Sequence, residues 1–182
     1  MSDMSDRLDR VLADDYVAGV EDLSIDEVRA RRAECQEIEV GLSYARRIVQ
    51  GRLDIIHAEA QRRSSGSGPS SNSELVDRLE KGEMLGDQAR PAGFGRLPTT
   101  MGPGDDSDEY LAEADAVAGA DVLANVSGLD DAAVQSLAES LGEVERSLSQ
   151  RRRQVFERID IFQGEIVRRY KSGIADPDSL LA

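Results

Sequence analysis

Two stretches of this 182-residue chain read SIDEVRARRAECQEIEVGLSYARRIVQGRLDIIHAEAQRR (residues 24–63) and DDAAVQSLAESLGEVERSLSQRRRQVFERIDIFQGEIVRR (residues 130–169), and neither contains a proline. Each begins with a residue that caps helices, Ser24 in a capping box with Glu27, and Asp130. Apolar residues or cysteine recur every seven positions, at 28, 35, 42, 49 and 56 and again at 134, 141, 148, 155 and 162. A seven-residue period over five repeats predicts a coiled coil built from two long helices.

The rest of the chain divides around these helices. We expect an all-α protein with an acidic N-terminal arm (1–24), a first long helix (25–64), a linker (65–129), a second long helix (130–171) and a tail (172–182). Apolar spacing predicts an amphipathic helix over residues 5–23. Within the linker we expect a flexible break at 64–72, short helices at 73–85 and 109–121, and unstructured chain over 86–108.

Composition excludes several classes of protein. The net charge is −14, and outside the two long helices acidic residues outnumber basic ones by 21 to 6, which argues against direct binding to DNA. The acidic segments either keep the chain soluble or attract a basic protein. No apolar run is long enough for a membrane helix, the N-terminus does not read as a signal peptide, and the single Cys with one His predicts no metal site. We therefore expect a cytoplasmic protein.

Two residue types that often mark reactive sites have a simpler interpretation here. Cys35 lies on the heptad stripe, so we interpret it as a small core residue, and the lone His57 as structural. The sequence also contains no metal-binding constellation and no phosphate-binding loop, so we do not expect an enzyme.

The two long helices are copies of one another. Shifted by 106 residues, the first aligns with the second, with 12 identities over the 25 positions from Glu39 to Arg63. Most of the identical residues are polar, and core packing does not require them. They are Glu39/Glu145, Leu42/Leu148, Ser43/Ser149, Arg46/Arg152, Arg47/Arg153, Val49/Val155, Arg52/Arg158, Asp54/Asp160, Ile55/Ile161, Glu59/Glu165, Arg62/Arg168 and Arg63/Arg169.

Some of these polar residues form a ladder along one side of each helix. At about 100° per residue, the first ladder falls within a wedge of about 80° that borders the apolar stripe. The ladder residues are Glu39, Ser43, Arg46, Gln50 and Asp54 in the first copy, and Glu145, Ser149, Arg152, Phe156 and Asp160 in the second. A solvated face of ion pairs is the simpler interpretation. Repetition of the same Ser, Arg and Asp favours a binding site, because Arg and Asp recognise guanine edges, and Arg and Ser bind phosphate.

The spacing E-x3-S-x2-R-x3-Q-x3-D, present once on each long helix, resembles the motif of the RsiG family of actinobacterial anti-sigma factors. Glu39 to Asp54 matches in full, and the second copy has Phe156 in place of Gln. The resemblance implies an antiparallel two-helix coiled coil in which both ladders bind cyclic di-GMP, as a dimer of ligand molecules. It also implies a WhiG-type sigma factor as partner, held inactive while the ligand is bound, so that sporulation genes are not transcribed.

The resemblance implies further that the short helices wrap the sigma factor, with Leu75, Val76, Leu79 and Leu85 as a docking surface. Two other interpretations stay open at this stage. One is a coiled-coil adaptor or scaffold that binds no ligand, and the other is an enzyme of nucleotide turnover.

Overall fold

The computed structural model describes residues 3–65 and 107–173. Its elements are the helices α1 (Asp3–Leu12), α2 (Ile25–Ser64), α4 (Ser107–Ala118), α5 (Ala120–Ala124) and α6 (Asp131–Lys171), and the 3-10 turns η1 (Asp14–Tyr16) and η2 (Val126–Gly128). These residues contain no strand, which confirms the predicted all-α class. None of the described helices has the length and apolar character needed to cross a membrane.

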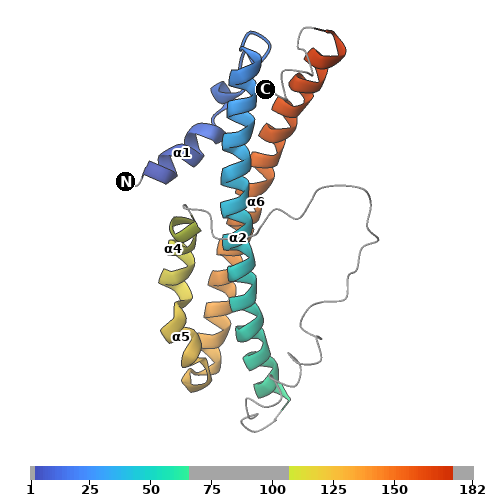
Figure 1. Cartoon of the computed structure of the whole chain (residues 1–182). Helices are drawn as coiled ribbons and strands as arrows, with labels where there is room; N and C mark the ends of the chain where they lie inside the picture. Colours follow the sequence, from blue (N-terminus) through green and yellow to red (C-terminus); the bar gives the residue numbers. More distant parts are fainter. Residues whose placement is uncertain (1–2, 66–106, 174–182) are drawn as a thin grey trace.

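The long helices α2 and α6 lie side by side and run in opposite directions (Figure 1). Both start at the predicted caps. The Ser24 hydroxyl accepts a hydrogen bond from the Glu27 backbone at 3.2 Å, and the Asp130 carboxylate accepts one from the Ala133 backbone at 2.7 Å. A capped end satisfies backbone donors that the first helical turn leaves without partners. The antiparallel two-helix arrangement is therefore present as predicted.

The heptad stripes form the seam between α2 and α6. Every stripe position is at most 2% exposed, namely Val28, Cys35, Leu42, Val49 and Ile56 on α2 and Val134, Leu141, Leu148, Val155 and Phe162 on α6. Burial raises the pKa of the Cys35 thiol to about 11, so this side chain acts as a small apolar filler. The predicted coiled-coil core is confirmed.

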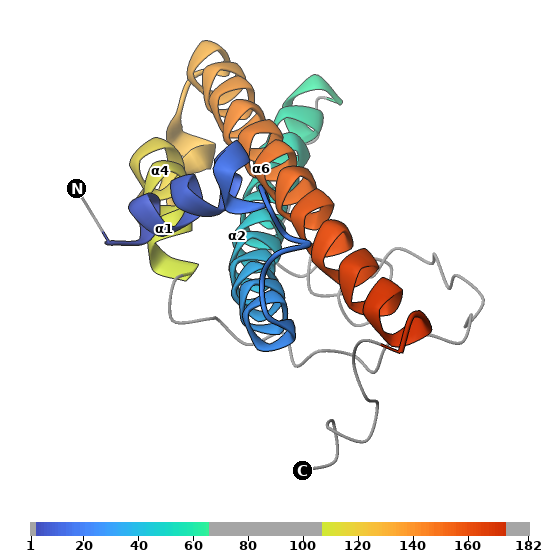
Figure 2. The same cartoon turned by 90° about the horizontal axis from the view of Figure 1, so that it is seen from above.

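Two short arms cover one side of this seam. The first arm (residues 3–23, with α1 and η1) lies beside one half of the helix pair, and the second arm (residues 107–129, with α4, α5 and η2) beside the other (Figures 1 and 2). Leu8 and Val11 of the first arm and Tyr110 and Ala114 of the second are buried in the core. The Tyr110 ring approaches Gly41 so closely that a Cβ atom there would lie 2.9 Å from it.

The shorter elements differ in part from those that the sequence predicted. The helix predicted over residues 5–23 is too long, because α1 ends at Leu12 and Gly19 has a φ of +65°, a left-handed conformation that no α-helix contains. The helix predicted over 109–121 is present as α4 and α5, which separate at Gly119. The predictions for residues 65–106, including the docking surface at Leu75, Val76, Leu79 and Leu85, lie outside the described residues except for Ser65, the C-cap of α2.

The 106-residue repeat extends into the arms. Arg158 of α6 donates to the carbonyl of Leu12, and Arg52 of α2 donates to the carbonyl of Ala118, 106 residues further on. In the same way Arg169 donates to the carbonyls of Val20 and Glu21, and Arg63 to those of Val126 and Ser127. Each arm is therefore held by the long helix of the other repeat, and the described molecule has an approximate two-fold axis through the middle of the seam.

Candidate functional site

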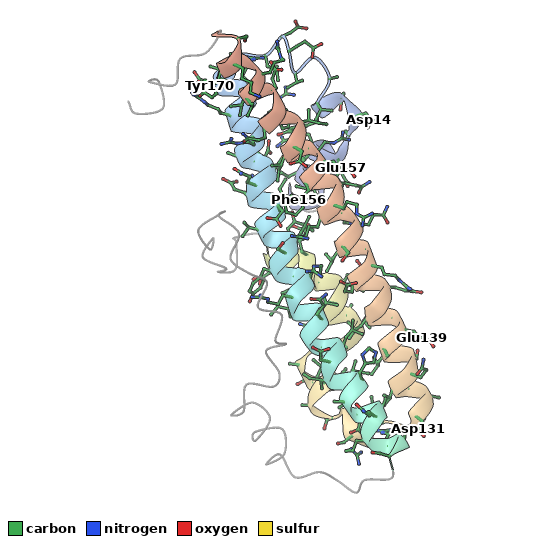
Figure 3. All side chains as sticks on the ribbon, turned by 90° about the vertical axis from the view of Figure 1, so that its right-hand side faces the viewer. Asp14, Asp131, Glu139, Phe156, Glu157 and Tyr170 are labelled. Atoms are coloured by element: carbon green, nitrogen blue, oxygen red, sulfur yellow. The ribbon has the colours of Figure 1, made fainter. Side chains whose placement is uncertain are left out.

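The two polar ladders lie on the side of the seam away from both arms. Figure 3 views the helix pair from this side, with Phe156 between α2 and α6 and the arms behind them. Eight of the ten ladder residues are half-buried, namely Glu39, Ser43, Arg46, Gln50, Glu145, Ser149, Arg152 and Phe156. The structure therefore brings together most of the residues that the motif identified.

Reciprocal ion pairs connect the ladders across the seam. Arg152 of α6 lies 2.9 Å from Glu39 of α2, and Arg46 of α2 lies 3.4 Å from Glu145 of α6. The two pairs are exchanged by the approximate two-fold axis, because Glu39 and Glu145 are equivalent residues, as are Arg46 and Arg152. The arginine side chains are about one third exposed, at 31% and 32%, so their guanidinium groups can be reached from solvent.

The two serines lie next to this axis and fix the glutamates. The Ser43 hydroxyl donates to Glu39 at 2.6 Å, and the Ser149 hydroxyl donates to Glu145 at 2.9 Å. Each serine is four residues after its glutamate, so both side chains lie on the same face of their helix. Ser43 also accepts a hydrogen bond from Nε of Arg152 at 2.6 Å.

The two halves of the site differ where Phe156 replaces the motif glutamine. Gln50 donates to Glu145 at 3.2 Å, whereas the guanidinium of Arg152 stacks over the Phe156 ring at 4.6 Å from its centroid. Arg152 thus has a carboxylate, a hydroxyl and an aromatic ring as partners. Nε of Arg46 is buried and has no hydrogen-bond partner, which leaves one donor of that half unsatisfied.

The two aspartates of the motif do not join this network. Asp54 and Asp160 are exposed and lie near opposite ends of the site. Counting 1.5 Å per residue from the two-fold axis places them roughly 35 Å apart along the helix pair. The arrangement as a whole offers two guanidinium groups near the centre and one carboxylate towards each end, which suits an elongated, two-fold symmetric ligand with anionic groups and hydrogen-bond donors.

Several other polar identities of the repeat hold the arms or orient the residues that do. Glu59 and Glu165 are buried, and each accepts hydrogen bonds from the two arginines that follow it, at distances of 2.5–2.7 Å. The hydrogen bonds from Arg62 and Arg168 lower the pKa values of these two carboxyls to about 2. The arginines Arg63 and Arg169 then reach the arm carbonyls.

The sequence alone suggested no function for Glu59, Glu165 and the arginines that follow them. Their repetition was visible, and the same 106-residue offset continues upstream with Asp9/Asp115, Val11/Val117, Asp15/Asp121, Ala18/Ala124, Val20/Val126 and Leu23/Leu129. These identities upstream of the long helices were the signal from which two equivalent arms could have been predicted.

Residues 3–65 and 107–173 contain no group of three or more His, Cys, Asp or Glu side chains arranged to hold a metal ion. Among the candidate site residues themselves, the groups that meet are guanidinium, carboxylate, hydroxyl and amide groups and the Phe156 ring. Such a set can bind a ligand by hydrogen bonds, charge and stacking.

Comparison with known proteins gives one family. No curated protein matches the chain. The family model described as RsiG-like matches residues 14–83 and 120–182, which include both ladders and both long helices. The matched segments begin at positions 14 and 120, again 106 residues apart. Because the match covers more than half of the chain, this protein belongs to the RsiG-like family, whose members are anti-sigma factors, and this indicates an anti-sigma role for the chain.

Proposed function

We propose that this chain binds cyclic di-GMP across the two ladders and, when loaded, sequesters a WhiG-type sigma factor so that sporulation genes are not transcribed. One observation carries the proposal. The ion pairs Arg46–Glu145 and Arg152–Glu39 are related by an approximate two-fold axis, on the side of the seam that the arms leave open. Cyclic di-GMP is itself two-fold symmetric, so two equivalent half-sites suit it.

The arginines are the main recognition groups of the proposal. A guanidinium donates two parallel hydrogen bonds to O6 and N7 of guanine, or to a phosphate, and such a contact contributes about 1–3 kcal/mol. Arg46 and Arg152 contact glutamates in the structure, so a bound ligand either replaces these glutamates or shares the arginines with them.

The aspartates complete the recognition of guanine. An ionised carboxylate accepts hydrogen bonds from the N1–H and N2–H groups on the Watson–Crick edge. Because Asp54 and Asp160 lie near opposite ends of the site, one small molecule at its centre does not reach both. This spacing favours a pair of cyclic di-GMP molecules, one for each ladder.

The proposed action is a ligand-gated clamp without a catalytic step. Bound cyclic di-GMP becomes part of the surface that the sigma factor contacts, so ligand and sigma factor stabilise each other's binding. When the ligand concentration falls, the clamp weakens and the sigma factor is released to RNA polymerase.

The test is a calorimetric titration of the full chain with cyclic di-GMP, with and without a purified WhiG-type sigma factor. Replacing both Arg46 and Arg152 by alanine should abolish ligand binding and ligand-dependent capture. A matched control replaces Arg153 and Lys171 by alanine, which removes two positive charges from exposed positions outside the ladders and the arms and should bind as the wild type does.

The same titration separates the alternatives. A ligand-independent coiled-coil adaptor would capture its partner equally well without cyclic di-GMP and would show no change in melting temperature with it. Unchanged capture by the Arg46→Ala, Arg152→Ala double variant contradicts the proposed site.

A further inference from the structure

An open pocket continues the ladder face at one end of the helix pair. It has a volume of about 440 Å³ and is lined by Leu53 and His57 of α2 and by Ala138, Glu139, Gly142, Glu143 and Arg146 of α6. On α2 the lining residues follow Gln50 by three and seven positions, so they extend the ladder by two further turns. A Cβ atom placed on Gly142 would meet no atom within 4 Å, so the α6 side of the pocket has space for a larger group at this position.

The opposite end of the ladder face is lined differently, although the repeat makes the two ends equivalent. The residues equivalent to Ala138, Gly142 and His57 are Arg32, Gln36 and Gln163. There the long side chain of Arg32 crosses the seam and donates to Gln163 at 2.6 Å. Small residues at one end and a bridging pair at the other therefore make the two halves of the site unequal.

The chemistry of the pocket suits a purine base. Leu53, Ala138 and Gly142 provide apolar surface, and the His57 imidazole provides a flat ring against which a base can stack. Glu139 and Glu143 provide carboxylate acceptors, and Arg146 provides a guanidinium donor. Guanine presents two adjacent donors and the acceptor O6 on its Watson–Crick edge, whereas adenine presents one donor and one acceptor there, so carboxylates favour guanine.

We propose that this pocket receives one guanine base of the bound ligand and makes the half-site of Arg46 and Gln50 the stronger of the two. The inference rests on the proposed function, because it names where a base of that ligand lies. The half-site of Arg46 and Gln50 is the one beside the pocket, because Gln50 lies one helical turn before Leu53, so the first ligand molecule enters there. The half-site of Arg152 and Phe156 fills second, since its guanidinium already has three partners.

A matched pair of glycine substitutions tests this placement. Gly142→Leu fills the pocket, and Gly164→Leu puts the same side chain on the same helix at an exposed position with no neighbour within 4 Å. Both changes replace glycine by a good helix former, so both variants should fold. Binding of cyclic di-GMP is measured by calorimetry, with cyclic di-AMP as the second ligand. Ala138→Leu fills the pocket from the neighbouring turn and serves as an independent variant.

The wild type should bind cyclic di-GMP in two unequal steps and should bind cyclic di-AMP far more weakly. Gly142→Leu and Ala138→Leu should weaken the tighter step by at least about fivefold, the loss expected when a base cannot stack, while Gly164→Leu leaves it unchanged. Unchanged affinity in both pocket variants, or two equal steps in the wild type, overturns the placement and leaves the proposed function standing. A wild type that binds no cyclic di-GMP overturns both.

Discussion

Nε of Arg152 on α6 lies 2.9 Å from a carboxylate oxygen of Glu39 on α2, and the approximate two-fold axis relates this pair to Arg46 and Glu145, which are 3.4 Å apart. The contact joins residues 113 positions apart in the chain. It brings the two copies of the motif together into one site, and it holds the guanidinium groups at the surface of the seam.

The first prediction concerns the strength of this ion pair. A double-mutant cycle with Glu39→Ala and Arg152→Ala should give a coupling of about 0.5–1 kcal/mol in the free energy of unfolding, because both groups are only partly exposed. The pair Arg146–Glu143 is a matched control, since its atoms are 3.9 Å apart and both side chains are more than 70% exposed. That control should show no measurable coupling in urea denaturation, and equal coupling in both cycles would contradict the prediction.

The second prediction concerns the attachment of the first arm. Arg169 is 5% exposed and donates to Glu165 and to the carbonyls of Val20, Glu21 and Leu23. Arg169→Ala should lower the free energy of unfolding by about 3 kcal/mol, because it leaves a buried carboxylate and three carbonyls without this partner. Hydrogen exchange should also become faster in residues 5–23. Lys171→Ala, an exposed change two residues away, should stay within about 0.5 kcal/mol of the wild type.

The third prediction is a pH dependence. The pKa values of Glu59 and Glu165 are lowered to about 2 by hydrogen bonds from Arg62 and Arg168, so these carboxylates stabilise the fold above their unfolded pKa near 4.5 and lose that contribution as pH falls towards 2. A Glu59→Gln, Glu165→Gln variant should melt below the wild type at pH 7. The gap in melting temperature should narrow between pH 4.5 and 2, and a gap that stays constant over this range would show that ionisation is not the cause.

The fourth prediction uses two glycines of α2. Gly41→Ala should destabilise the protein although alanine is the better helix former, because the new Cβ would lie 2.9 Å from the buried Tyr110 ring of the second arm. Gly51→Ala has no neighbour within 4 Å and should stabilise the protein by up to about 1 kcal/mol. Thermal denaturation of both variants measures the difference, and a stabilised Gly41→Ala variant would contradict the close approach of α4.

The sequence predicted the long helices well because the signals for them are local. Caps at Ser24 and Asp130 and a seven-residue apolar period are properties of neighbouring residues, and the structure has α2 and α6 where those signals lie. The two ladders could also be predicted from local spacing, since residues three and four apart share a helix face. The path of the first arm was missed, because its carbonyls at Val20 and Leu23 accept hydrogen bonds from Arg169, almost 150 residues away in the chain, and a local pattern does not reveal such contacts.

The amino-acid order alone was enough to establish two capped helices, an apolar seam and a duplicated motif, because each of these depends on spacings of a few residues along one helix. Which groups face each other across the seam was settled by folding, since the pairing of Arg152 with Glu39 depends on the relative position of two distant helices. The same holds for the pocket beside His57 and for the hydrogen bond from Arg32 to Gln163 at the other end. Equivalent positions of the repeat become unequal only when side chains of different length meet across the helix pair.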